Sequence, residues 1–237
     1  VAEGLVSIQR IDDSARRVLR LKFEQGLFDN PYVDEQAAAR IVGNPEAQRQ
    51  ADAVQRASQV LLRNDRATLP VAPGQRIWLH GVDPVAARAA GFVVVDDPAQ
   101  AQVALVRTAT PFETLHPHHF FGSRQHEGRL DLRPDDKDVQ AIARAAAHVP
   151  TIVAIEMDRP AILTAIEPMA RALIVTFGAS DAAVLDVVAG RATAQGRLPF
   201  SLPRSMADVG AQRPDLSDDG PPPAYPRGAG IVVGGDQ

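Results

Sequence analysis

The sequence predicts an α/β fold, with a mostly parallel sheet sandwiched by helices. Short apolar runs rich in β-branched residues alternate with segments of helical spacing through most of the chain. Such alternation is typical of parallel strands joined by helices that cover both faces of the sheet. The chain has 237 residues, of which 45% are hydrophobic and 23% charged, so it can bury a full core.

The first helix is predicted between Ile11 and Phe23, where apolar residues recur at mainly helical spacing. Asp12 and Asp13 lie at its start, where the helix dipole favours negative charge. Gly26 suits the C-terminal cap, and the proline-containing turn that follows prevents the helix from continuing.

A second helix is predicted over Pro45–Leu62, and a new domain is expected to begin after it, at residue 71. The segment 215–225 contains three consecutive prolines and is expected to be extended and irregular. Between them the predicted strands are Ile77–Leu79, Phe92–Val95, Val103–Val106, Thr151–Ile155 and Ala172–Phe177, and the predicted helices are Pro84–Ala90, Asp136–His148 and Ser180–Val188.

Composition excludes several classes of function. The net charge is −4 and no basic stripe is present, so nucleic acid and anionic membranes are not expected partners. The absence of cysteine excludes disulfides, thiol nucleophiles and zinc–thiolate sites. No apolar run approaches membrane-spanning length and no export signal is visible, while the start at Val1 suggests a missing upstream portion.

Three segments of the chain resemble family 3 glycoside hydrolases. The first, Arg10–Phe23 with Gly26–Tyr32, is similar to the segment that closes the family's N-terminal barrel. Leu61–Asp65 resembles the entrance to the second domain, and Gly196–Pro203 resembles a late signature. The resemblance implies that residues 1–32 end a barrel domain, 33–70 form a linker with a lead-in helix, and 71–237 form the C-terminal α/β sandwich.

The same resemblance implies a retaining, exo-acting β-glucosidase of a bacterial subgroup, which removes terminal β-D-glucosyl residues in cellulose degradation. In this family the barrel donates an aspartate nucleophile and the α/β sandwich donates the general acid/base. The expected partners are therefore a β-glucoside or gluco-oligosaccharide and the barrel domain, with no cofactor, and the chain could form a homodimer. By itself the chain is expected to be inactive, and a periplasmic or secreted location is favoured.

Glu113 is the first candidate for the acid/base. The stretch Thr110-Pro111-Phe112-Glu113 follows a predicted strand and resembles the family's Pro-aromatic-x-Glu loop, with one residue fewer. Ligand-binding loops lie beyond the carboxyl ends of the strands in open α/β sheets, which is where Glu113 is expected. Glu127, in the same long loop, is the second candidate.

The loop between these two glutamates carries further candidates. His119, Phe120 and Phe121 are expected to form a leaving-group subsite, with Arg124 as a further substrate-binding residue, because aromatic faces stack on sugar rings. The alternative is that both phenylalanines anchor the loop as core. Four histidines also crowd this loop, at positions 116, 118, 119 and 126, and suggest a metal site, but their spacing matches no common zinc pattern and Pro117 interrupts them.

Three other functions stay open. The chain could be a non-catalytic carbohydrate-binding or interaction module that retains the family fold, a β-xylosidase of the same family, or a metal-dependent hydrolase built on the histidines. Ser180-Asp181 superficially resembles the family's nucleophile motif, but Ala182 follows. This pair is interpreted as the cap and first turn of a helix.

Overall fold

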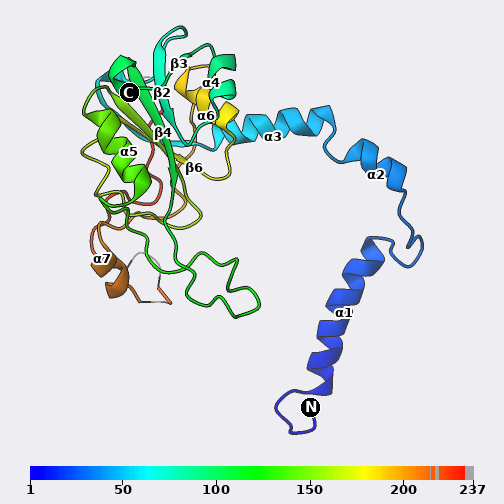
Figure 1. Ribbon diagram of the computed structural model, residues 1–237. Coiled ribbons are helices and arrows are strands. Elements are labelled where there is room, and N and C mark those ends of the chain that lie inside the picture. Colours follow the sequence, from blue (N-terminus) through cyan, green and yellow to red (C-terminus); the bar gives the residue numbers. More distant parts are fainter. Residues whose placement is uncertain (214, 217–218, 233–237) are drawn as a thin grey trace. The chain divides into compact units, whose positions relative to one another are not determined.

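The structure is a computed structural model that describes residues 1–213, 215–216 and 219–232 (Figure 1). The chain divides into two compact units, Val1–Arg49 and Gln50–Gln237. Among the described residues, no helix combines the length and the apolar character needed to cross a bilayer.

The first unit contains the predicted first helix, α1 (Ile8–Glu24), and a short helix α2 (Glu35–Ile41). The Ser7 hydroxyl accepts a hydrogen bond from the Arg10 amide at 3.1 Å and caps α1, and Gly26 takes the left-handed conformation after it, with φ +68°. No residue of either helix is buried. The apolar side chains of α1 are therefore exposed.

Helix α3 (Pro45–Ala57) ends before the predicted limit at Leu62, so that part of the prediction is wrong. Residues Val60–Asn64 instead form strand β1. A segment far along the chain contacts the end of this helix, where the Gln195 amide donates to the Ala57 carbonyl at 3.0 Å. A Cβ added at Gly196 would lie 2.3 Å from the Ser58 carbonyl oxygen, so glycine permits this close approach.

Six strands form one sheet in the order β1-β6-β5-β4-β2-β3. Strand β1 pairs antiparallel with β6, and all other neighbours are parallel. The sheet therefore takes one strand from the segment predicted as linker, and the prediction of a mostly parallel sheet is confirmed. The remaining strands are β2 (Arg76–His80), β3 (Val93–Val95), β4 (Val103–Ala109), β5 (Thr151–Glu156) and β6 (Ala172–Thr176).

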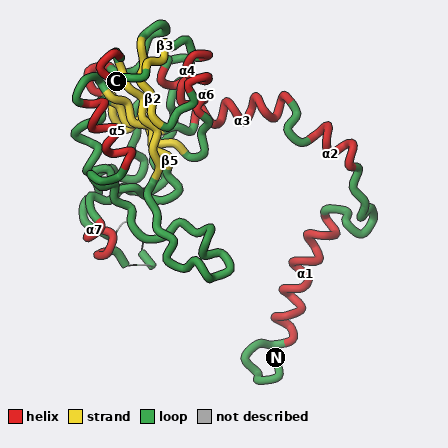
Figure 2. The backbone as a smooth tube through the Cα atoms, viewed as in Figure 1, coloured by secondary structure: helices red, strands yellow, loops and turns green. Residues whose placement is uncertain are grey.

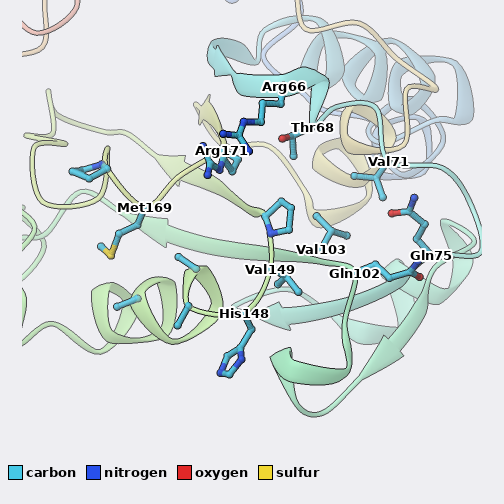
Figure 3. Close-up of a pocket in the computed structure, with 15 residues that line it drawn as sticks. Arg66, Thr68, Val71, Gln75, Gln102, Val103, His148, Val149, Met169 and Arg171 are labelled. Atoms are coloured by element: carbon cyan, nitrogen blue, oxygen red, sulfur yellow. The ribbon is translucent and has the colours of Figure 1, made fainter.

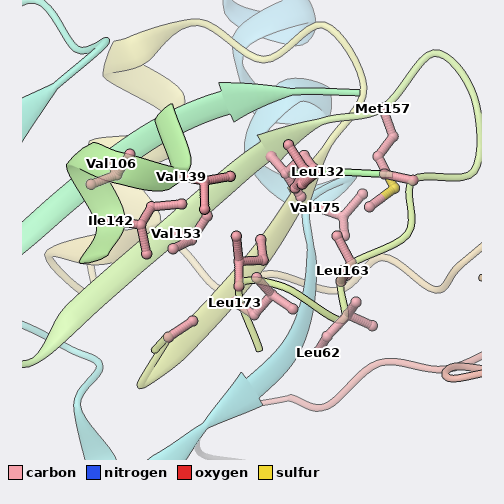
Figure 4. Close-up of a cluster of buried hydrophobic side chains, with 14 of the residues drawn as sticks. Leu62, Val106, Leu132, Val139, Ile142, Val153, Met157, Leu163, Leu173 and Val175 are labelled. Atoms are coloured by element: carbon pink, nitrogen blue, oxygen red, sulfur yellow. The ribbon is translucent and has the colours of Figure 1, made fainter. Parts of the chain in front are cut away.

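Helices cover both faces of this sheet, as predicted. On one face, α5 (Lys137–Ala146) packs Val139 and Ile142 against Val106 and Val153 (Figure 4). On the other face, α4 (Pro84–Ala89) and α6 (Asp181–Val188) join a second buried cluster. Side chains alternate between the two clusters along β5, because successive residues of a strand point to opposite faces.

The C-terminal part returns to the sheet. After helix α7 (Met206–Ala211), the Leu202–Tyr225 and Leu61–Ile231 bridges hold the chain against the domain. Residues 219–225 are in neither helix nor strand, as expected, whereas 214 and 217–218 lie outside the described residues. The described residues also include two short 3₁₀ turns, η1 (Asp65–Ala67) and η2 (Pro98–Gln100).

Candidate active site

Strand β4 leads directly to the candidate acid/base. At its end, the Thr110 amide donates to the Glu156 carbonyl at 2.9 Å, and the Thr110 hydroxyl donates to the Arg159 carbonyl at 2.9 Å. Thr110 is buried, whereas Phe112 and Glu113 are exposed. The chain therefore leaves the sheet at its carboxyl edge and enters a long loop without regular structure (Figure 2).

Glu113 and Glu127 close the base of this loop as a pair. The Glu113 amide donates to the Glu127 carbonyl at 2.9 Å, and the Glu127 amide donates to the Glu113 carbonyl at 3.2 Å. Residues that exchange both bonds are directly opposed and project their side chains to the same face. The two candidate residues are thus directly opposed, but the Glu113 carboxylate reaches the Arg129 amide and the Glu127 carboxylate reaches the Leu115 amide.

The Glu113 carboxylate lies over a glycine. Its Oε2 accepts a hydrogen bond from the Arg129 amide at 2.9 Å. Gly128 has φ +68°, and a Cβ at this position would lie 1.9 Å from Glu113 Oε2. Only glycine allows both the left-handed backbone and the position of this carboxylate.

The Glu127 carboxylate is engaged within the loop. Its two oxygens lie 2.9 and 3.0 Å from His116 Nδ1, and Oε2 also accepts from the Leu115 amide at 3.1 Å. The hydrogen bond from His116 lowers the pKa of Glu127, and this effect outweighs desolvation, which acts in the opposite direction. Glu127 is therefore held as a carboxylate and is poorly suited to donate a proton.

Arg159 joins the two chain segments at the base of the loop, one at Pro111 and the other at Gly128 and Arg129. Its Nη2 donates to the Pro111 carbonyl at 2.6 Å and to the Arg129 carbonyl at 3.3 Å, and its Nη1 donates to the Gly128 carbonyl at 3.3 Å. One side chain thus holds the backbone on both sides of Glu113. No local pattern in the sequence indicates this role of Arg159, because the three carbonyls lie 30 to 48 residues away along the chain.

Arg129 connects the segment that leaves the loop to the start of α5. Its guanidinium binds both carboxylate oxygens of Asp136, at 2.9 and 2.6 Å, and this contact lowers the pKa of Asp136. Asp136 precedes α5 but makes no side-chain cap, because its carboxylate is already bound to Arg129 and to the Arg133 amide. Arg129 donates to Glu113 through its backbone amide, while its guanidinium binds Asp136.

Arg107 belongs to a separate cluster at the same edge of the sheet. It pairs with Asp181 and, at 3.5 Å, with Glu156. The Ser180 hydroxyl accepts from the Ala183 amide at 3.2 Å and caps α6, which confirms the interpretation of Ser180-Asp181 as a helix start.

The tip of the loop exposes aromatic side chains. Phe120 is 89% exposed and Phe121 58%, and their rings meet edge to face at 4.6 Å. They are therefore not part of the domain core. His119 stacks on His116 at 5.1 Å, and Arg124 is exposed on the same loop.

Two of the four histidines in this loop are paired with carboxylates. His116 binds Glu127, while His126 binds Asp158 through Nδ1 and stacks on Phe112 at 3.8 Å. In the described part of the chain, no group of three or more His, Cys, Asp or Glu residues is placed to hold a metal ion.

The fold and the site together define an α/β domain that presents carboxyl groups on a loop beyond the carboxyl edge of its sheet. The chain belongs to glycosyl hydrolase family 3, and residues 92–233 match the C-terminal domain of that family.

Individual relatives agree with this assignment. The chain is 47% identical over 231 residues to a periplasmic β-glucosidase/β-xylosidase from Dickeya chrysanthemi, covering 98% of this chain and 35% of the relative. It is 39% identical over 234 residues to β-glucosidase C of Emericella nidulans, covering 98% and 37%. The crystal structure of a β-glucosidase from Listeria innocua has the same fold, with a TM-score of 0.72 at 18% identity, covering 98% of this chain and 40% of the other. The chain thus spans little more than a third of the length of these curated relatives.

Proposed function

We propose that this chain is the C-terminal part of a retaining, exo-acting β-glucosidase, in which Glu113 is the general acid/base. Family membership and the names of the relatives support the glycosidase class. Residues 1–32 then end the N-terminal barrel, residues 33–70 connect it to the sandwich, and the barrel supplies the aspartate nucleophile. The chain alone is expected to be inactive.

The choice of Glu113 over Glu127 rests on the different hydrogen-bond partners of their two carboxylates. Glu127 is bound through both oxygens by His116 and is kept ionised. Glu113 is exposed and is oriented through Oε2 by one backbone amide. Its Oε1 accepts no hydrogen bond from any described residue and is available to carry the transferable proton.

The roles follow from the chemistry of retaining glycosidases. Such enzymes need two carboxyl groups about 5 to 5.5 Å apart, one to attack the anomeric carbon and one to protonate the leaving oxygen. Glu113 first donates its proton from Oε1 to the glycosidic oxygen. As a carboxylate it then removes a proton from the water that releases the sugar from the nucleophile.

The exposed loop tip is proposed as the leaving-group subsite. Phe120 and Phe121 offer exposed ring faces to the apolar side of a sugar, and His119 and Arg124 lie on the same loop as hydrogen-bond donors to its hydroxyls. Since the name of the Dickeya relative includes both activities, β-xylosides are the second candidate substrate. The same name supports a periplasmic location.

The test uses the full-length enzyme that contains this chain. Glu113→Gln and Glu127→Gln variants are compared on an aryl β-glucoside and on cellobiose. Glu113→Gln is expected to lose cellobiose hydrolysis, to retain more activity on an aryl glucoside with a good leaving group, and to regain turnover with azide as a glycosyl azide product. If Glu127→Gln shows this pattern and Glu113→Gln does not, the assignment moves to Glu127.

A further inference from the structure

A cavity of about 700 Å³ lies at the amino-terminal edge of the parallel strands (Figure 3). Gln75, Gln102, Pro150 and Arg171 line it, and each immediately precedes a strand of the sheet. The Glu113 loop follows the opposite, carboxyl end of β4, roughly 20 Å away for a strand of this length. The cavity is therefore separate from the candidate active site.

Two arginines meet at one side of this cavity. The Asp65 amide donates to the Arg171 carbonyl at 2.8 Å, so Arg66 and Arg171 lie on adjacent segments, and Figure 3 shows their side chains reaching the same region. Arg66 and Ala67 both have positive φ, at 54° and 50°, a conformation unfavourable for residues other than glycine. The Thr68 hydroxyl stabilises this turn by donating to the Asp65 carbonyl at 2.7 Å.

Two acidic residues close in sequence to these arginines, Asp65 and Glu167, are paired with a third arginine. Arg63 lies 3.9 Å from the Asp65 carboxylate and 4.0 Å from that of Glu167. None of the fifteen residues that line the cavity is acidic. Within the ranges that the structure describes, Arg66 and Arg171 form no ion pair, so two neighbouring positive charges remain without a counter-ion.

The rest of the lining suits an organic molecule rather than a simple ion. A cavity of this size falls in the range of small-molecule sites. Thr68, Gln75 and Gln102 provide polar groups beside the two guanidinium groups. The apolar part of the wall includes Val71, Val103, Val149, Pro150, Pro168 and Met169.

We propose that this cavity binds an acidic sugar, with its carboxylate or phosphate group between Arg66 and Arg171 and its ring against the apolar wall. A guanidinium group matches a planar carboxylate or a phosphate through paired hydrogen bonds, and the anion offsets the repulsion between the two arginines. The carbon–hydrogen face of a sugar ring covers the apolar side chains. This binding site is independent of the role of Glu113.

The experiment is titration calorimetry on this chain at constant ionic strength, with D-glucuronate and glucose 6-phosphate as ligands. D-glucose and inorganic phosphate serve as the neutral and the non-sugar controls. The variant carries Arg66→Asn and Arg171→Gln, because asparagine tolerates the left-handed backbone at position 66. Arg88→Gln, on the exposed surface of α4 and outside the cavity, is the matched control.

The acidic sugars are expected to bind the wild-type chain and the Arg88 variant equally, and the double variant at least about tenfold more weakly. Circular dichroism of the double variant is expected to match the wild type. The proposal is overturned if neither acidic sugar binds, if the folded double variant binds as well as the wild type, or if D-glucose binds equally. Inorganic phosphate binding as tightly as glucose 6-phosphate overturns the role of the sugar ring.

Discussion

Glu113 and Glu127 are opposed across the base of one loop, exchanging backbone hydrogen bonds of 2.9 and 3.2 Å, yet their carboxylates have different partners. Glu127 binds His116, whereas Glu113 lies over Gly128 and accepts from the Arg129 amide. The paired backbone places both glutamates at the carboxyl edge of the sheet, so position does not distinguish them. Their side-chain contacts do, and these contacts make Glu113 the better candidate for the acid/base.

The His116–Glu127 contact predicts a measurable pH dependence. Because the pKa of Glu127 is lowered from 4.5, its stabilising contact is fully present above that value and is lost as the pH falls through the lowered pKa. His116→Ala is expected to return the pKa of Glu127 towards 4.5, as followed by NMR titration of its side-chain carboxyl carbon. His118→Ala, in the same loop, is the control and should leave the pKa of Glu127 unchanged.

Gly128→Ala is expected to displace the Glu113 carboxylate. The added Cβ would lie 1.9 Å from Oε2, and the positive φ adds backbone strain. In the full-length enzyme we expect kcat to fall by about 100-fold, since small misplacements of a catalytic group have effects of that order. Gly74→Ala is the matched control, because Gly74 also has positive φ, +85°, but no atom within 4 Å of the added Cβ. Equal kcat losses in both variants would contradict the contact with Glu113.

Arg159→Lys is expected to loosen the base of the loop. A single ammonium group cannot reproduce hydrogen bonds to the carbonyls of Pro111, Gly128 and Arg129. We expect the free energy of unfolding to fall by about 2 kcal/mol. Amide hydrogen exchange at Glu113 and Glu127 should accelerate, whereas exchange in β5 should change less.

An Arg88→Lys variant controls for the chemical change itself, because Arg88 lies on the exposed surface of α4. Unaltered exchange at Glu113 in the Arg159→Lys variant would show that Arg159 does not position the loop.

Phe120→Ala is expected to weaken substrate binding and to leave the stability of the fold nearly unchanged. Phe120 is 89% exposed, so its removal should change the free energy of unfolding by less than about 0.5 kcal/mol. In the full-length enzyme, KM for cellobiose should rise several-fold, because the leaving glucose loses a stacking surface. The rate constant for hydrolysis of the glycosyl-enzyme intermediate should not change, since the leaving group has departed by then. A large loss of stability with unchanged KM would assign Phe120 to packing against another part of the enzyme.

Local patterns in the sequence predict most of the regular structure. The short apolar runs at β2, β3, β4, β5 and β6, and the helical spacing of α1, α4, α5 and α6, appear within a few residues of each predicted range. Each pattern is local because side chains alternate along a strand and recur every three to four residues along a helix. Strand β1 is different: Val60–Leu62 continue the apolar spacing of α3, and only pairing with β6 makes them a strand.

By itself, the sequence determined the fold class, the family resemblance and the two glutamates worth considering. Tertiary structure decided which contacts each glutamate makes, that Arg159 holds Pro111 from 48 residues away, and that Arg66 and Arg171 meet at one cavity. The physical reason is the distance along the chain over which each effect acts. Backbone propensity and periodicity depend on near neighbours, whereas the environment of a carboxylate or guanidinium depends on groups that only the folded chain brings together.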